Sequence, residues 1–296
     1  MLRYSCICKK KMIISHINGG LGNQMFQYAA GKTLAQLNNT FLKLDVSEFD
    51  KNNLRNFDLL SFEANILFAA KQDINDLLPS HNFEKAFQYF SPLKKRTYYR
   101  EKSFSFDEKV LRLGKNVYLK GYFQSEKYFL PAKNMIRKDF TFKGSVVTHV
   151  AEFVSQLNNT SSVSIHVRRG DFSKNPEISE FHGTLEKEYY LAAINLVRSK
   201  IENPVFYFFS DDIDWVKENL SIPNASYLSG SITKNHFEDL YLMSQCKHNI
   251  IANSSFSWWG AWLNENPGKL VIGPKKWFNQ GPKDTQDLLP EKWIKI

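Results

Sequence analysis

The sequence predicts an α/β protein of two Rossmann-type domains. Its 296 residues exceed the size at which a single hydrophobic core usually stops growing, and an apolar content of 43% is enough for two cores. Short β-rich runs alternate with helical patterns, as in βαβ units around a parallel sheet. We therefore expect a first domain over residues 12–150 and a second over 160–296, with a polar boundary near 143–160.

In the first domain the regular pattern is confined to its two ends. Residues 50–110 mix aromatic, polar and charged residues without a sustained period, so no element is assigned there. We expect strands over 12–17, 41–46 and 117–123, a glycine turn at 18–22, and helices over 23–37 and 125–139.

The second domain alternates regularly between strands and helices. Polar residues directly follow each strand, and the carboxyl ends of parallel strands form the rim at which ligands bind. The sequence therefore predicts a nucleotide-type site at this rim. The expected strands cover 162–167, 205–209, 225–228, 249–252 and 270–272, and the expected helices cover 185–201, 212–220, 237–246 and 256–263.

The first of these strands ends in the run His166-Val167-Arg168-Arg169-Gly170-Asp171. Side chains alternate along a strand, so His166 and Arg168 point to one face and Arg169 to the other. A guanidinium can hold two oxygens of a phosphate or carboxylate at once, which indicates an anionic ligand. The alternative is a solvated loop start in which the arginines pair with Asp171.

A second anion site is expected where the strand at 249–252 passes into a helix. Free N–H groups and the macrodipole favour negative charge at a helix start. Simple N-capping explains the serines there equally well. Trp258, Trp259 and Trp262, further along the helix, are interpreted as core residues. The residues of the expected site are Asn253, Ser254, Ser255, Phe256 and Ser257.

The glycine turn at 18–22 opens a helix, as the phosphate-binding turns of dinucleotide folds do. It lacks their third glycine and a Walker lysine. The alternative is that Gly19, Gly20 and Gly22 merely permit a tight turn. Asn23 and Gln24 would then lie at the mouth between the domains.

Asp212 and Asp214 match the D-x-D pattern that holds a divalent metal in many sugar transferases. Carboxylates are also expected at a helix start for dipole reasons, and we favour this explanation because a metal and Arg168 would compete for the same phosphate charge. His182 and His236 are isolated and add no metal-ligand spacing, so no metal site is predicted.

The amino-acid composition limits the cellular compartment and the binding partners to be expected. Three cysteines are too few for a disulfide framework, and no apolar run approaches the roughly 20 residues of a membrane span, so we expect a cytoplasmic protein. A net charge of +9 suits an acidic substrate or peripheral contact with an anionic inner membrane. No RNA-binding motif or continuous basic face is present, so nucleic acid is not an expected partner. Met12 is a candidate start, with residues 1–11 disordered, and the oligomeric state is left open.

Five segments together resemble the bacterial α-1,2-fucosyltransferases of glycosyltransferase family 11. In order along the chain they are 19–28 (GGLGNQMFQY), 164–171 (SIHVRRGD), 209–212 (FSDD), 239–246 (DLYLMSQC) and 251–262 (IANSSFSWWGAW). The resemblance implies a GT-B-like pair of Rossmann-type domains that face each other across a cleft, with GDP-fucose in the second. It further implies inverting, metal-independent transfer of L-fucose, without a cofactor, to the 2-hydroxyl of a terminal galactose on a glycan acceptor.

The resemblance also implies roles for residues. Arg168 would hold the β-phosphate as charge develops on GDP, while Asp239 and His166 would contact guanine and ribose. Ser254, Ser255 and Ser257 would surround the phosphates, and Asn23 would approach from the other domain. Gly22, Arg169, Asn253 and Phe256 complete the expected donor site.

The base that takes the acceptor proton is less well defined. Asp171 is the candidate by sequence, but it would equally orient Arg168 or Arg169. Residues 47–110 match no family motif and are expected to influence acceptor choice. Two alternatives stay open: a metal-dependent transferase that uses Asp212 and Asp214, and a non-catalytic relative that binds glycan or nucleotide.

Overall fold

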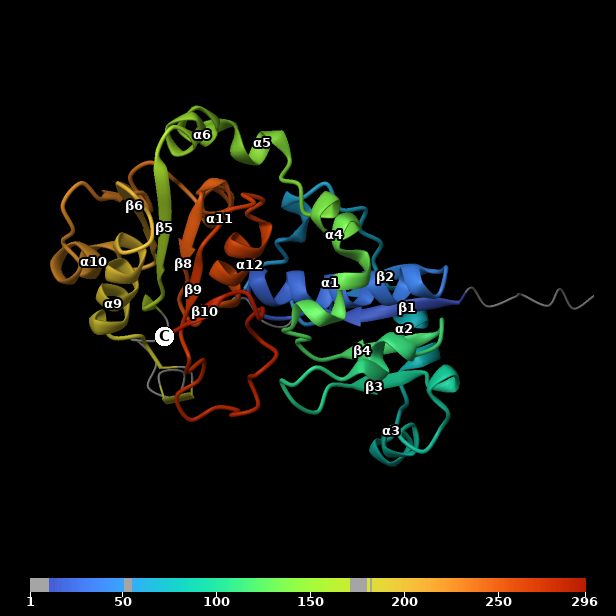
Figure 1. Cartoon of the computed structure of the whole chain (residues 1–296). Helices are drawn as coiled ribbons and strands as arrows, with labels where there is room; N and C mark the ends of the chain where they lie inside the picture. Colours follow the sequence, from blue (N-terminus) through green and yellow to red (C-terminus); the bar gives the residue numbers. More distant parts are fainter. Residues whose placement is uncertain (1–10, 51–54, 171–179, 182) are drawn as a thin grey trace, which may run out of the picture.

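The computed structural model describes residues 11–50, 55–170, 180–181 and 183–296. Residues 1–10, Asp171 and His182, which enter the expectations above, lie outside the described residues. The described chain forms two parallel sheets, each with its own helices, in two halves that lie side by side (Figure 1). Within the described residues, no helix is long and apolar enough to cross a membrane.

The first sheet has four parallel strands in the order β2-β1-β4-β3. The strands are β1 (Met12–His16), β2 (Phe41–Asp45), β3 (Tyr98–Arg100) and β4 (Val117–Lys120). Helix α1 (Leu21–Leu37) connects β1 to β2, as expected. Every residue of β1 is buried, as befits a strand with neighbours on both sides.

Two expectations for this half are wrong in detail. The strand expected over 117–123 ends at Lys120, because Gly121 follows it and Phe123 has a positive φ of 52°. The helix expected over 125–139 is broken into the 3₁₀ turns η4 (Glu126–Tyr128) and η5 (Leu130–Ala132) before α4 (Lys133–Asp139) begins. Pro131 lies in η5, where it has no N–H to donate to a preceding turn.

The segment without a clear pattern contains short elements. They are η1 (Leu59–Ser61), α2 (Lys71–Leu77), α3 (Asn82–Phe87), η2 (Leu93–Lys95) and η3 (Glu108–Arg112), together with β3. The connection to the second half runs through α5 (Gly144–Val147), η6 (Thr148–Val150) and α6 (Ala151–Asn158), which pass over one end of the molecule (Figure 1). The boundary at 150–160 stays a prediction.

The second sheet has six parallel strands in the order β10-β9-β8-β5-β6-β7. They are β5 (Ser161–Val167), β6 (Pro204–Ser210), β7 (Ser226–Tyr227), β8 (His248–Ile250), β9 (Val271–Gly273) and β10 (Ile294–Lys295). The expected helices are present as α9 (Lys187–Arg198), α10 (Ile213–Asn219), α11 (His236–Gln245) and α12 (Ser255–Leu263). Helices α11 and α12 lie on the side of this sheet that faces the first half (Figure 1).

One of the hydrophobic cores runs from one half into the other. Trp258 and Trp259 of α12 are completely buried, and both rings contact Phe26 of α1, with centroids 4.5 and 4.9 Å apart. Phe129 stacks on Trp259 at 5.2 Å. Trp262 is buried too, so the interpretation of all three tryptophans as core residues is confirmed. Two further cores each lie within one half, and the division into two domains stays a prediction.

Candidate functional site

The strand order of the second sheet locates its ligand crevice. Outward from β5 lie β6 and β7 on one side, and β8, β9 and β10 on the other, which is the order found in dinucleotide-binding domains. The direction of progress therefore reverses between β5 and β8, and ligands of such sheets bind beyond the strand ends at this point. The residues at this switch point are 166–170, at the end of β5, and 251–257, which lead into α12.

Arg168 is held at the switch point by a carboxylate from the next strand. Its Nη1 lies 2.7 Å from Oδ2 of Asp211, which directly follows β6. Oδ1 of Asp211 accepts the N–H groups of Arg169 and Gly170 at 2.9 and 3.0 Å. A Cβ on residue 170 would lie 2.5 Å from Oδ2, so glycine is needed there. The Arg168 side chain is 23% exposed, so its fixed charge stays accessible to a ligand.

Arg169 has other partners. Its guanidinium lies 4.0 Å from the ring centroid of Trp215, and its Nε is 3.6 Å from Oδ2 of Asp212. That Nε is buried and makes no hydrogen bond within the described residues. The two adjacent guanidiniums, which lie just beyond the end of β5, therefore have different partners. The alternative pairing with Asp171 falls outside the described residues, and the described carboxylate partner of Arg168 is Asp211.

His166 is buried between β5 and α12. Its ring lies 5.5 Å from that of Phe256, so the structure brings these two expected site residues together. The pKa of His166 is lowered to about 4, chiefly by burial and in part by the neighbouring Arg168, against the raising effect of Asp211. The imidazole is therefore neutral at physiological pH. Its Nδ1 is buried without a hydrogen-bond partner among the described residues.

The polar side chains at the start of α12 form hydrogen bonds with nearby backbone groups. Ser254 is the N-cap, and its Oγ accepts the N–H of Phe256 at 3.3 Å, as the capping interpretation predicts. Ser257 is buried and donates to the carbonyl of Ser254 at 3.3 Å, so its side chain is directed into the helix. Asn253 donates to the carbonyls of Gly183 and Trp277 and anchors the turn before the helix.

Helix α1 meets α12 at their N-termini. A Cβ on Gly22 would lie 2.4 Å from the backbone carbon of Ser255, and Trp259 Nε1 donates to the Gly22 carbonyl at 3.0 Å. Oδ1 of Asn23 accepts hydrogen bonds from Ser255 and from Gln124, both at 2.8 Å. The structure thus brings Asn23 to the serine cluster, as expected.

The second residue expected at the mouth is placed differently. Gln24 is completely buried, and its amide binds the backbone of Gly19, Asn56 and Asp58. The expectation for Gln24 is therefore wrong, because its polar groups are used to shape the loops around the glycine turn.

Asp239 of α11 accepts two hydroxyl hydrogen bonds. Ser229 donates to its Oδ2 at 2.9 Å and Thr233 donates to its Oδ1. Ser229 in turn accepts the N–H of Ser210 at the end of β6, at 3.0 Å. Burial raises the pKa of Asp239 to about 6, while the two hydroxyls and His236 lower it. The carboxylate therefore stands at the rim, linked to the end of β6.

The D-x-D residues form part of a helix start. Asp212 is the N-cap of α10, and its Oδ1 accepts the N–H of Trp215 at 3.3 Å. Asp214 lies in the first turn, where the dipole favours a carboxylate. Among the described residues no group of three or more potential ligands could hold a metal ion. Metal independence stays a prediction.

The sequence places Asp211 at the rim but assigns it no role, and Glu101 was missed. The pairing of Asp211 with Arg168 follows from topology, since β5 and β6 pair in parallel with Val167 opposite Ser210, which places the residues after each strand side by side. Glu101 follows β3, a strand of three residues with no recognisable period, and no signal in the sequence pointed to it.

Comparison with known proteins agrees with this geometry. The model of glycosyl transferase family 11 matches residues 3–296. An α-1,2-colitosyltransferase of Escherichia coli is 33% identical over 294 residues, which cover 96% of this chain and 99% of that protein. The E. coli O-antigen biosynthesis glycosyltransferase WbnK is 34% identical over 305 residues, covering 95% and 99%. Human galactoside α-(1,2)-fucosyltransferase 1 is 26% identical over 293 residues, covering 94% and 73%.

Solved structures share the fold at low sequence identity. The fucosyltransferase NodZ from Bradyrhizobium matches with a TM-score of 0.51 and 14% identity, over 85% of this chain and 92% of that one. Arabidopsis thaliana FUT1, solved in complex with GDP, matches with a TM-score of 0.52 and 12% identity, over 95% of this chain and 75% of that one. The GT-B-like fold predicted from the sequence is confirmed. Because the family model covers nearly the whole chain and the two E. coli relatives align over almost their full lengths, we conclude that the chain belongs to glycosyl transferase family 11 and is a glycosyltransferase.

Proposed function

We propose that this enzyme transfers L-fucose from GDP-fucose to the 2-hydroxyl of a terminal galactose on an oligosaccharide acceptor, with inversion and without a metal ion. The observation that carries the proposal is the position of Arg168, which Asp211 fixes at the switch point while its guanidinium stays accessible. The α-(1,2)-fucosyltransferase activity named for the human relative supports the donor and the linkage.

The site suits the charge that develops during this reaction. Cleavage of a sugar–phosphate bond leaves negative charge on the diphosphate. A guanidinium already held in place can stabilise that charge without reorganisation, and the N-terminus of α12 adds backbone N–H groups and a positive dipole end. In this arrangement GDP lies beyond β5 and α12, next to the buried and neutral ring of His166.

A second donor deserves a test because of the E. coli relatives. An α-1,2-colitosyltransferase is 33% identical over almost the whole chain, so a sugar nucleotide that carries colitose is the second candidate. Both donors would place a diphosphate at Arg168. The choice between them depends on contacts to the sugar.

The test is a transfer assay with the purified full chain. GDP-fucose and the corresponding colitose donor are each offered with an array of β-galactosides, and products are identified by mass spectrometry and their linkage by NMR. An α-1,2-fucosylated galactoside is the expected product. Transfer of colitose alone would replace the proposed donor, and binding of GDP without transfer would identify a non-catalytic relative.

Metal dependence is tested in the same assay. Activity is expected to survive excess EDTA, because Arg168 and the start of α12 provide the positive charge. Loss of activity with EDTA and its rescue by manganese would assign the phosphate contacts to Asp212 and Asp214 instead.

A further inference from the structure

A cavity of about 360 Å³ lies between the halves, at the carboxyl ends of β1, β3 and β4. Its lining joins residues of the first sheet to Pro282 and Asp284 of the second half. Tyr122 and Phe104, both in the lining, stack with centroids 6.2 Å apart and planes 16° apart. A flat aromatic wall beside polar groups suits the face of a sugar ring.

Glu101 is the lining carboxylate that the backbone positions most firmly. The N–H of Tyr122 donates to its Oε2 at 2.7 Å, and the N–H of Phe123 donates to both oxygens at 3.0 and 3.1 Å. Phe123 has a positive φ of 52°, which turns its N–H toward the carboxylate. A Cβ on Gly121 would lie 2.8 Å from Oε2, so glycine makes room for the side chain.

The surroundings of Glu101 make it a proton acceptor near neutral pH. The pKa of Glu101 is raised to about 7, chiefly by burial and in part by the charge of Asp284, against the lowering effect of the two backbone N–H groups. The cavity also contains Arg100, Lys102 and Lys120. A general base is most effective when its pKa lies near the working pH.

His16 is the other titratable lining group that could serve. Burial and Lys120 lower its pKa, while Asp45 and Glu48 raise it, and its Nε2 lies 3.6 Å from Glu48 Oε2. The imidazole is buried and lies next to Glu48, so Glu101 is the stronger candidate for the general base.

We propose that Glu101 is the catalytic base and that this cavity binds the acceptor galactoside. The proposal rests on the proposed function. The Glu101 carboxylate takes the proton of the acceptor hydroxyl, whose oxygen forms the new bond to the anomeric carbon. The bond from that carbon to the β-phosphate oxygen breaks, and its electron pair leaves with GDP beside Arg168.

The test compares Glu101→Gln with Glu108→Gln, a matched change of an exposed carboxylate on η3. Gln keeps an oxygen for the backbone N–H groups but cannot take a proton. We expect kcat to fall roughly 100-fold or more, the KM for GDP-fucose to stay near that of the wild type, and the acidic limb of the kcat–pH profile to vanish. Azide needs no deprotonation to attack the sugar, so formation of fucosyl azide should proceed in Glu101→Gln at the wild-type rate.

Three outcomes would overturn the assignment while leaving the proposed function intact. They are a Glu101→Gln enzyme with near wild-type kcat, a parallel loss of transfer and of fucosyl azide formation, or an acidic limb that is removed only by His16→Asn. If the wild type transfers fucose to no β-galactoside, the proposed function itself fails.

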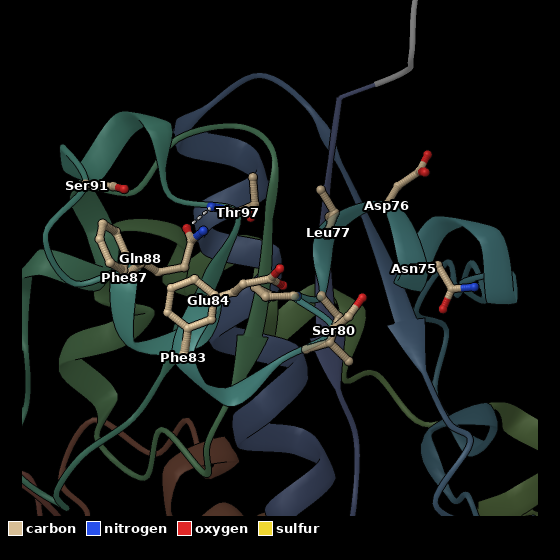
Figure 2. A pocket seen from close by; sticks show the side chains of 12 residues that line it. Asn75, Asp76, Leu77, Ser80, Phe83, Glu84, Phe87, Gln88, Ser91 and Thr97 are labelled. Carbon is tan, nitrogen blue, oxygen red and sulfur yellow. Dashed lines mark hydrogen bonds between the residues drawn. The ribbon is translucent and has the colours of Figure 1, made fainter.

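A second, independent feature is an aromatic patch on the outside of the first half. It consists of Phe83, Phe87 and Phe90, which are 66, 62 and 85% exposed. Their rings contact in series, with centroids 5.7 and 6.2 Å apart. Phe83 and Phe87 project from α3 beside a groove that Leu77 and Thr97 also line (Figure 2). Solvent-exposed phenylalanines in contact with one another indicate a surface that binds something apolar.

Basic side chains accompany this patch. Residues 81–100 contain five lysines and arginines and one glutamate, a net charge of +4. Lys94 and Lys95 are exposed, and Arg96 donates to the carbonyls of Tyr89 and Ser91, which fixes the segment after α3. Exposed aromatic rings next to basic side chains are the combination that enters the headgroup region of anionic bilayers.

We infer that the aromatic patch and its basic neighbours dock the enzyme on an anionic lipid surface. The test is co-sedimentation of the full chain with vesicles of phosphatidylcholine, with and without phosphatidylglycerol. Binding is expected only to the anionic vesicles and should weaken in high salt. Phe83→Ser/Phe87→Ser/Phe90→Ser should abolish it, and Lys94→Glu/Lys95→Glu should weaken it by roughly tenfold or more.

The matched control is Lys200→Glu/Lys217→Glu, an equal change of charge on exposed lysines of the second half. It should bind vesicles nearly as the wild type does, and all variants should keep their activity on a soluble acceptor. Equal binding by the aromatic variant would overturn the inference. So would a concentration-dependent dimer that the aromatic changes dissolve, since a second copy would then be the occupant.

Discussion

At the scale of residues, Arg168 and Arg169 show how adjacent side chains of one type acquire different tasks. Arg168 pairs with Asp211 and stays accessible, whereas Arg169 packs on Trp215 beside Asp212. Both residues lie just beyond the end of β5. We therefore expect substitutions at the two positions to have different consequences, on catalysis at Arg168 and on packing at Arg169.

Substitution of Arg168 should act on the chemical step. Arg168→Ala is expected to lower kcat on the order of a hundredfold or more, as removal of one transition-state donor does elsewhere. Arg168→Lys should stay well below the wild type, because an ammonium cannot reproduce the planar fork. Steady-state kinetics with an unfolding curve for each variant measure this. A folded Arg168→Lys enzyme with near wild-type kcat would show that charge alone suffices.

Substitution of Asp239 should separate ligand binding from stability. The resemblance assigns Asp239 to guanine, whose N–H groups need an acceptor. Asp239→Asn puts a donor there, so we expect GDP affinity measured by calorimetry to fall. The pKa of Asp239 is raised from 3.8 to about 6 in the folded protein, so its ionisation is disfavoured by folding. The wild type should accordingly gain stability relative to the Asn variant as the pH falls from 6 to 4. Unchanged GDP binding would remove Asp239 from the site.

At the scale of elements, the contact between α1 and α12 positions both sides of the site. Gly22 lets the two helix starts approach, and Asn23 binds Ser255 across the gap. The glycine-rich motif is thus explained by helix-to-helix contact. A role of its backbone toward the donor stays a prediction.

Gly22→Ala tests this contact, because the close approach of the helices decides whether the variant is more or less stable than the wild type. Alanine in place of glycine within a helix is normally stabilising by about 0.5–1 kcal/mol. Here the new Cβ would lie 2.4 Å from the backbone of Ser255, and overpacking typically costs about 1–3 kcal/mol. We therefore expect net destabilisation in urea unfolding. Gly20→Ala, where nothing lies within 4 Å of the added carbon, is the control and should change stability little.

The elements also show where prediction from sequence succeeds. Strand β5 and helix α12 were predicted because a buried run ends abruptly in polar residues, and this signal is local. Strand β3 was missed because three residues cannot display a period, and β10 because it is only two residues long. Asp211 is held by the backbone that follows β5, and Glu101 by the backbone that follows β4. Such contacts between distant segments leave no signal in a local sequence pattern.

At the scale of the whole molecule, the shared core predicts cooperative unfolding. Five tryptophans, Trp258, Trp259, Trp262, Trp277 and Trp293, belong to the core that spans both halves. Tryptophan fluorescence and far-ultraviolet circular dichroism should therefore report one coincident transition. Two separated transitions would mean that the halves fold independently despite their common interior.

The same aromatic interior limits how this enzyme can be recombined. Exchange of one half for that of a relative is an obvious route to new combinations of donor and acceptor. The seam of such a chimera would pass through the contacts of Phe26 and Phe129 with Trp258 and Trp259, which are packed ring against ring. A transplanted half must therefore supply aromatic rings that match those of the retained half. Grafting only the loops around the cavity, with Glu101 and Gly121 left in place, alters acceptor preference with less disturbance of the core.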